Sequence, residues 1–226
     1  MVNMMTAQWH PQLVLIMVLG LVCSGCVSTG ADTDTFLEKV AEEQQNIESL
    51  AYTETLTFHL GDKTRNIEYD VLLKKPDKFR KIERSGSDVR SEIVSNGSIV
   101  WIYDPEKNTV FIRNLTPSEK IPEPVAYALL TDNISEKYMI KNQEMESLNS
   151  TQAYKVKLIP LQPNSENVRE CLLWIDSDNL TPLKLQSWDK GDPLLTLEYR
   201  NYSMNCVIND DEFTFTIPYG ASVVYA

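Results

Sequence analysis

Apolar and polar residues alternate along most of this chain. Apolar side chains stand at positions 52, 56, 58 and 60 of one run and at 67, 69, 71 and 73 of the next, alternating mostly with Thr, His, Glu and Asp. A period of two puts alternate side chains on opposite faces of a β-strand, so both runs predict long strands with one apolar face. Turn residues at 61–63 and 75–77 favour antiparallel pairing.

The same pattern predicts eight further strands, separated by turns that contain Gly, Asn, Asp or Pro. They span residues 78–84, 88–95, 98–104, 108–114, 151–161, 167–176, 182–189 and 194–204. Asn96-Gly97, flanked by strand residues, is the strongest of the hairpin signals. About ten antiparallel strands predict a mainly β (α+β) fold, an unclosed and strongly curved barrel.

Two segments have helical spacing instead. Residues 36–50 place apolar side chains three and four positions apart, opposite a row of glutamates, which predicts an amphipathic helix. Residues 122–130 begin with two prolines and continue with apolar residues, which predicts a second helix. We expect these helices to cover one opening of the barrel.

The N-terminus differs in composition from the rest of the chain. Residues 1–25 contain no Asp, Glu, Lys or Arg, and 13–22 are almost all apolar. This run is half the length of a bilayer span of about 20 residues, so it suits the hydrophobic region of a signal peptide. We predict a signal peptide over 1–25, a tether over 26–35 and one folded domain over 36–226.

Cys23 and Cys26 form a C-x-x-C motif that has three interpretations. A redox dithiol sits at a helix start after a core strand, whereas here a polar stretch follows an apolar run. A zinc site needs further ligands nearby, and no His stands close to Cys171 or Cys206. The third interpretation is a lipoprotein processing site, because two small residues precede Cys26.

Cys26 therefore resembles the lipid-modified cysteine of a lipobox, with Cys23 where that pattern usually has Leu. A diacylglyceryl group supplies two acyl chains, enough for stable anchoring at about 0.8 kcal/mol per buried CH₂. We expect an exported protein held by Cys26 at the outer face of the cell membrane.

Composition narrows the choice of partners. Hydrophobic residues make up 42% and charged residues 23% of the 226 residues, which are ordinary globular values. The formal net charge of −11 argues against a nucleic-acid partner, because phosphate binding requires a basic surface. It also disfavours binding to anionic lipid by charge alone.

Three motifs in order resemble the LolA/LolB-like superfamily. They are KKPDKFR (74–80), SNGSIVWIYDP (95–105) and INDDEFTF (208–215), the last followed by Pro218. This superfamily includes lipoprotein carriers of the periplasm and sensors of the RseB/MucB kind. The resemblance implies a half-barrel with an apolar concave face, lidded by helices, that accommodates acyl chains.

The resemblance also implies ligand-binding residues. Arg80 matches the arginine that bonds to the lid in the carriers, although a surface strand residue would fit the same position. The apolar candidates for the cavity, each of which would equally suit a plain core position, are Leu56, Phe58, Tyr69, Val71, Phe79, Trp101, Tyr103 and Leu129.

Two functions follow. The first is a membrane-anchored envelope lipoprotein that binds acyl chains of a lipid or lipoprotein, in the manner of a carrier or acceptor. The alternative is an envelope sensor or interaction module that uses the same fold to bind a protein partner without transferring lipid. No cofactor or metal is expected in either case.

The sequence offers little for catalysis. His59, the one histidine after the signal peptide, lies among threonines without Cys, Ser or acidic partners in a catalytic pattern. The stretch from Asp176 opens like a calcium loop, but Thr181 and Ser187 replace its Gly and Glu, which favours a turn. We therefore expect no enzyme.

Export would allow two modifications. Cys171 and Cys206 form an even pair that permits a disulfide in an exported domain, and buried thiols are the alternative. Six N-x-S/T sites would be glycan acceptors in a cell that N-glycosylates: Asn96, Asn114, Asn133, Asn149, Asn179 and Asn201.

Overall fold

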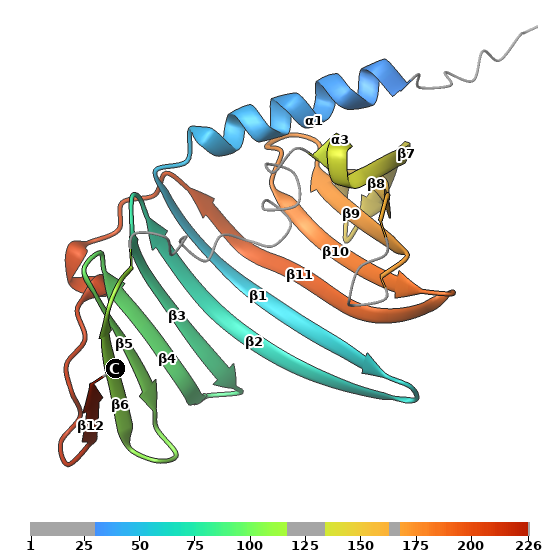
Figure 1. The fold of residues 1–226 in the computed structure, drawn as a ribbon. Coiled ribbons are helices and arrows are strands. Elements are labelled where there is room, and N and C mark those ends of the chain that lie inside the picture. The colour runs from blue at the N-terminus through green and yellow to red at the C-terminus, as the bar shows by residue number, and fades with distance from the viewer. Residues whose placement is uncertain (1–29, 117–133, 163–167, 226) are drawn as a thin grey trace, which may run out of the picture.

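A computed structural model describes residues 30–116, 134–162 and 168–225, which form a curved 12-stranded sheet with one long helix across one end (Figure 1). The strand order is β12-β6-β5-β4-β3-β2-β1-β11-β10-β9-β8-β7. The two edges, β12 and β7, do not pair with each other, so the sheet is open. The predicted mainly β, unclosed fold is confirmed.

The strands are β1 (Ser49–Leu60), β2 (Lys63–Lys74), β3 (Lys78–Ser85), β4 (Asp88–Asn96), β5 (Ile99–Asp104), β6 (Thr109–Asn114), β7 (Tyr138–Leu148), β8 (Thr151–Pro160), β9 (Glu170–Asp176), β10 (Pro182–Asp189), β11 (Asp192–Met204) and β12 (Ser222–Tyr225). The helices are α1 (Gly30–Gln45), the single turn α3 (Ile134–Lys137) and the 3₁₀ turn η1 (Asp210–Phe213). All neighbouring strands are antiparallel except β12, which runs parallel to β6.

The prediction of about ten strands missed β7 and β12. In β7 the register shifts between Ile140 and Asn142, so the apolar period changes phase in the middle of the strand. In β12 all four residues are exposed, which leaves no period of two to recognise. Both strands lie at sheet edges.

Helix α1 begins earlier and ends earlier than predicted. It starts at Gly30, so residues 30–35 of the predicted tether are helical, and it stops at Gln45 instead of continuing to residue 50. Ile47 and Leu50 are nevertheless buried, Leu50 as part of β1. The predicted second helix, 122–130, lies outside the residues that the structure describes.

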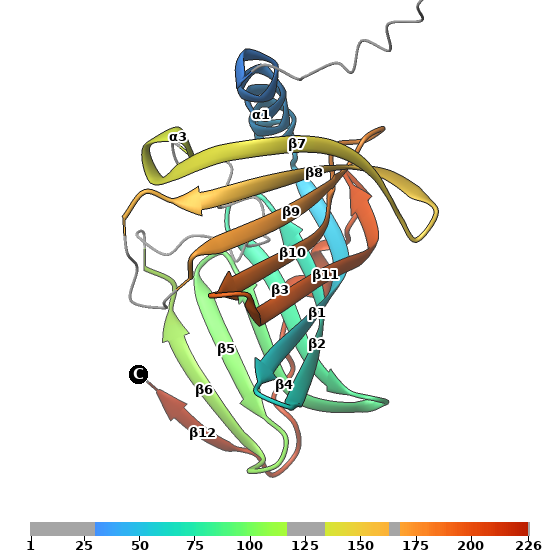
Figure 2. The same cartoon turned by 90° about the vertical axis from the view of Figure 1, so that its right-hand side faces the viewer.

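Strand β1 joins the two halves of the sheet. Leu56 pairs with Ile67 of β2 on one side and with Leu197 of β11 on the other. Figures 1 and 2 show α1 across one end of the curved sheet, with the tips of the β1–β2, β3–β4 and β5–β6 hairpins at the opposite end. We call that opposite end the rim.

The two faces of the sheet bury different sets of residues. One face, which we call the inner face, packs against Leu37 and Val40 of α1 and carries the core cluster of the protein. Its buried strand residues are Leu50, Tyr52, Val71, Leu73, Phe79, Val100, Val156, Leu158, Cys171, Leu173, Ile175, Leu185, Leu197 and Tyr199.

The other face, the outer face, is covered at β3–β6 by part of the C-terminal segment, residues 205–221, which precedes β12. Turn η1 contacts β3 and β4, and its Phe213 is fully buried. Val94 and Val110 are also fully buried but lie outside the core cluster, because they face this segment rather than α1. The sheet therefore has a second, smaller apolar layer.

Candidate ligand-binding face

Five of the predicted ligand-binding residues share the inner face: Leu56, Phe58, Tyr69, Val71 and Phe79. On β1 and β2 the pairs Tyr52–Val71 and Leu50–Leu73 fix this face, and Phe79 of β3 pairs with Leu73. Val71 and Phe79 are buried in the core cluster, and Leu56 and Tyr69 pack against it. These residues share one largely apolar face of the sheet.

Arg80, Trp101 and Tyr103 lie on the outer face instead. Arg80 pairs with Val94, and Val94 pairs with Trp101, so the three side chains share one face. Arg80 directly follows Phe79 on β3, so this face is opposite to that of Phe79. The ring of Phe215 lies 6.4 Å from that of Trp101 and 5.8 Å from that of Tyr103. The expectation that Trp101 and Tyr103 line the same cavity as Phe79 is therefore wrong, because they point to the opposite side of the sheet. Leu129 lies outside the described residues.

Arg80 holds the C-terminal segment against the sheet. Its guanidinium donates to Glu92 of β4 and to Glu212 of η1, at 2.9 Å in each case. Two lysines support the same turn, since Lys74 and Lys78 bind Asp210 at 2.6 and 2.9 Å. Their hydrogen bonds lower the pKa of Asp210 to about 2.

A charged pair interrupts the apolar inner face. The Nζ atom of Lys81 lies 3.5 Å from Oε2 of Glu54 and 4.0 Å from the ring centroid of Tyr69. Burial raises the pKa of the Glu54 carboxyl, against the smaller opposing effect of Lys81. The sequence contained a signal for the buried carboxylate, because Glu54 stands between Tyr52 and Leu56 at a position where the period of two places an apolar residue.

Helix α1 contributes a further polar group to the interior. Both amide atoms of Gln44 are buried without a hydrogen-bond partner. Gln44 follows Val40 by four residues and so lies on the helix face that packs on the sheet. A buried amide left unpaired costs about 1–3 kcal/mol.

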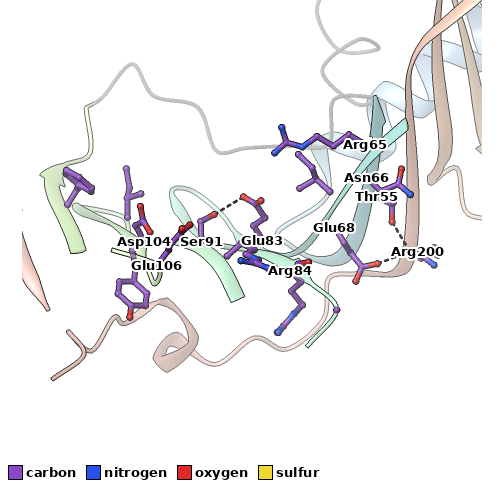
Figure 3. A pocket seen from close by; sticks show the side chains of 17 residues that line it. Thr55, Arg65, Asn66, Glu68, Glu83, Arg84, Ser91, Asp104, Glu106 and Arg200 are labelled. Carbon is purple, nitrogen blue, oxygen red and sulfur yellow. Dashed lines mark hydrogen bonds and ion pairs between the residues drawn. The ribbon is translucent and has the colours of Figure 1, made fainter. Parts of the chain in front are cut away.

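A pocket of about 960 Å³ opens at the rim (Figure 3). It lies at the tip of the β3–β4 hairpin. The last pair between β2 and β3 is Glu68–Arg84, so the part of β2 from Lys63 onward extends past this tip without a partner in β3. Its inner-face lining includes Arg65, Ile67, Glu83, Ser91, Ile102 and Phe111. Figure 3 shows Ser91 donating to Glu83 and Arg200 bound to Thr55 and Glu68.

Of the two alternatives for Cys171 and Cys206, the structure shows thiols and no disulfide. Cys171 lies on β9 opposite Ser187, which pairs with Leu195, whereas Cys206 follows the far end of β11. From Leu195 to Met204 the strand covers about 30 Å at 3.3 Å per residue. A disulfide requires Cα atoms within about 7 Å, so the two sulfurs are not joined.

The remaining predicted positions are spread over the molecule. Of the six asparagines, Asn114, Asn149, Asn179 and Asn201 are exposed, Asn96 is half-buried, and Asn133 is outside the described residues, as is Cys26. His59 and Thr196 share a hydrogen bond of 3.0 Å. Asp176 accepts from the backbone of Asp178 and Asn179, as expected for a turn.

The described residues contain neither a cluster of metal-ligating side chains nor a helix suited to span a membrane. No three His, Cys, Asp or Glu side chains in 30–116, 134–162 and 168–225 are grouped as a metal site would require. In the same ranges no helix combines the length and the apolar character of a membrane span.

An open, curved sheet whose apolar inner face is crossed by one helix defines a half-barrel protein. The family model of the outer membrane lipoprotein carrier protein LolA matches residues 42–216. The chain belongs to the LolA family.

Relatives by sequence cover nearly the whole chain. An uncharacterized protein of Methanocaldococcus jannaschii is 23% identical over 94% of this chain, which spans only 59% of that protein. The outer-membrane lipoprotein carrier protein of Hahella chejuensis is 24% identical, with coverage of 94% of this chain and 97% of the relative.

Solved structures share the fold. An uncharacterized conserved protein of Thermus thermophilus has a TM-score of 0.55 at 14% identity and covers 86% of this chain and 99% of its own. MucB in the MucA/MucB complex of Pseudomonas aeruginosa has a TM-score of 0.51 at 13% identity, over 82% and 61%. Lipoprotein LppX of Mycobacterium tuberculosis has a TM-score of 0.50 at 14% identity, over 78% and 97%.

Proposed function

We propose that this protein is an envelope lipoprotein, anchored through Cys26, that binds acyl chains of a lipid or lipoprotein against its inner face. The observation that carries the proposal is the apolar surface that runs from β2 across β1 and β11 to β8 beneath α1. Membership of a family of lipoprotein carriers supports it. Apolar burial supplies the affinity, at about 25 cal/mol for each Å² removed from water.

The test compares neighbouring positions on β1. Leu56 faces the inner side and Thr57 the outer side, so Leu56→Gln places an amide where the acyl chain would lie and Thr57→Gln does not. Full-length protein held in amphipol is titrated with a dansyl-labelled fatty acid. Leu56→Gln weakens binding about tenfold while Thr57→Gln leaves it within about twofold. Failure of the wild-type chain to bind the probe would refute acyl binding.

A sensor or interaction module is the second candidate function. The likeness to MucB, solved as a complex with MucA, favours it. In that case crosslinking in intact membranes yields a stoichiometric protein partner, and the purified protein carries no lipid. A lipid recovered by solvent extraction in near-equal molar amount would instead support the acyl-binding proposal.

A further inference from the structure

The inner face is apolar near α1 and becomes charged on β3 towards the rim. The inference drawn from this change rests on the proposed function and specifies its ligand further. Lys75, which follows β2, donates to the backbone carbonyl of Gln45 in the last turn of α1, so this end of β2 lies beside the helix. The nearest inner-face residues, Leu73 and Phe79, are apolar and buried. Towards the rim the next inner-face position on β3 is Lys81, followed by Glu83. A bound amphipathic molecule therefore has one preferred orientation.

The accessible charge at this transition is positive. The side chain of Lys81 is 26% exposed, whereas that of Glu54 is only 5% exposed, so a ligand meets the ammonium before the carboxylate. An ammonium has three donors. One is directed at Glu54 at the long distance of 3.5 Å, and the cation rests on the Tyr69 ring, which leaves capacity for another acceptor.

The rim pocket continues this polar region outward. Ile67, two residues beyond Tyr69, and Glu83, two residues beyond Lys81, both line it. Arg84 and Arg200, also in its lining, are paired with Asp70 and Glu68. With a volume of about 960 Å³ the pocket has room for a lipid headgroup, and Lys81 lies outside its lining, two positions along β3 from Glu83.

We propose that Lys81 binds the oxyanion, a carboxylate or phosphate, of an acylated ligand whose chains lie on the inner face across β1 and β11 and whose headgroup extends towards the rim pocket. Glu54 and Tyr69 hold the ammonium at this depth, at the boundary between the apolar surface and the pocket. The site should be selective for anionic over neutral amphiphiles, because only an oxyanion adds an ionic hydrogen bond to the donors that the ammonium does not direct at Glu54.

The experiment uses two probes with the same acyl chain. Full-length protein in amphipol is titrated with a dansyl-labelled fatty acid and with its uncharged methyl ester. Lys81→Met keeps the length of the side chain and removes the charge. We expect this variant to weaken the acid about tenfold, or about 1.4 kcal/mol, and to leave the ester within about twofold.

Lys184 provides a matched control on the outer face. Its Nζ atom lies 5.3 Å from the Trp174 ring centroid and 3.9 Å from Glu198, and its side chain is 19% exposed. Lys184→Met should change the affinity for neither probe. Equal weakening of acid and ester by Lys81→Met, or no weakening of either, would overturn the oxyanion site.

The outcomes separate the two proposals. If the wild type binds both probes equally, the oxyanion site is refuted and acyl binding stands; if it binds neither, the proposed function itself fails. Displacement of the acid by a phosphatidic acid supports a lipid headgroup. Displacement by inorganic phosphate alone would show that the site takes a free anion, which contradicts the lipid assignment.

Discussion

The ring of Phe215 packs against the ring of Trp101 on the outer face of the sheet, with centroids 6.4 Å apart. This contact joins the C-terminal segment to β5, beyond the 3₁₀ turn that Arg80 and two lysines hold. The segment therefore acts as part of the domain, and its removal would expose an apolar layer distinct from the inner face.

Phe215→Ala should lower the free energy of unfolding by about 1–3 kcal/mol. The loss is below that of a fully buried Phe because Phe215 is only half-buried. Urea unfolding of the purified full-length chain measures it. Tyr219→Ala is the control, since Tyr219 is fully exposed and its loss should change stability by less than about 0.5 kcal/mol. Equal effects of the two substitutions would show that the stack contributes nothing.

Arg80→Met should lower stability by about 1 kcal/mol without changing acyl-probe affinity. The substitution removes a partly buried ion pair to Glu92 and an exposed one to Glu212, both on the outer face. Arg90→Met, at an exposed arginine of the β4 start, is the control and should be near neutral in stability. A large loss of probe binding in Arg80→Met would favour the family role, in which this arginine controls access to the ligand.

The strand prediction succeeded where side chains alternated without interruption. Residues 52–114 carry six strands at almost the predicted bounds, because each run is short and ends at a turn residue such as Gly61, Gly86 or Gly97. Gly97 is required there, since its φ is +94° and a Cβ would collide with Asp77. The sequence could not show that the bulge in β7 changes its phase.

The candidate site was predictable only in part, for a physical reason. Period two shows that Phe79 and Arg80 face opposite sides, but not which side encloses the interior. The outer-face position of Trp101 depends on Phe215, more than a hundred residues away, folding back over β5. By contrast, the burial of Glu54 could have been predicted from the sequence. It occupies a position where the period of two places an apolar residue, so it is buried together with its apolar neighbours.

Cys26→Ser should release the protein from membranes. The lipobox interpretation makes the Cys26 thioether the attachment point for two acyl chains, and serine cannot replace the thiol. Fractionation by ultracentrifugation measures the redistribution, and intact mass reports acylation and cleavage before residue 26. Cys206→Ser is the control, because that thiol is not in a disulfide with Cys171 and should leave the anchor intact. An unchanged membrane fraction in Cys26→Ser would refute the anchor.

The same mass measurement tests the glycan sites. In a cell that N-glycosylates, the exposed Asn114, Asn149, Asn179 and Asn201 should carry glycan in preference to half-buried Asn96, because Asn96 accepts hydrogen bonds from Ser98 and Ile99. Peptide mapping before and after enzymatic deglycosylation assigns each site. Glycan found at Asn96 alone would contradict the order of accessibility.

Gln44→Met should raise the free energy of unfolding by about 1 kcal/mol. The substitution keeps the size of the side chain and removes two buried amide atoms that lack partners. Thermal unfolding of lipid-extracted protein measures it, with the exposed Gln45→Met as control. Destabilisation by Gln44→Met would show that the amide is hydrogen-bonded in solution, for which a bound ligand or water is the available partner.

Glu54→Gln should change the pH dependence of stability in a defined direction. Burial raises the pKa of Glu54 above its ordinary 4.5, with Lys81 opposing the rise, so the folded protein holds this proton more tightly than the unfolded chain does. The stabilising contribution is complete below pH 4.5 and is lost as the pH rises through the raised pKa. The stability of wild type minus that of Glu54→Gln should therefore fall as the pH rises above 4.5. Urea unfolding at several pH values measures this difference, and Glu48→Gln, an exposed glutamate, is the control. A difference that rises with pH instead would mean that attraction to Lys81 outweighs the cost of burial and that the pair is a tight ion pair, with less capacity to bind a ligand oxyanion.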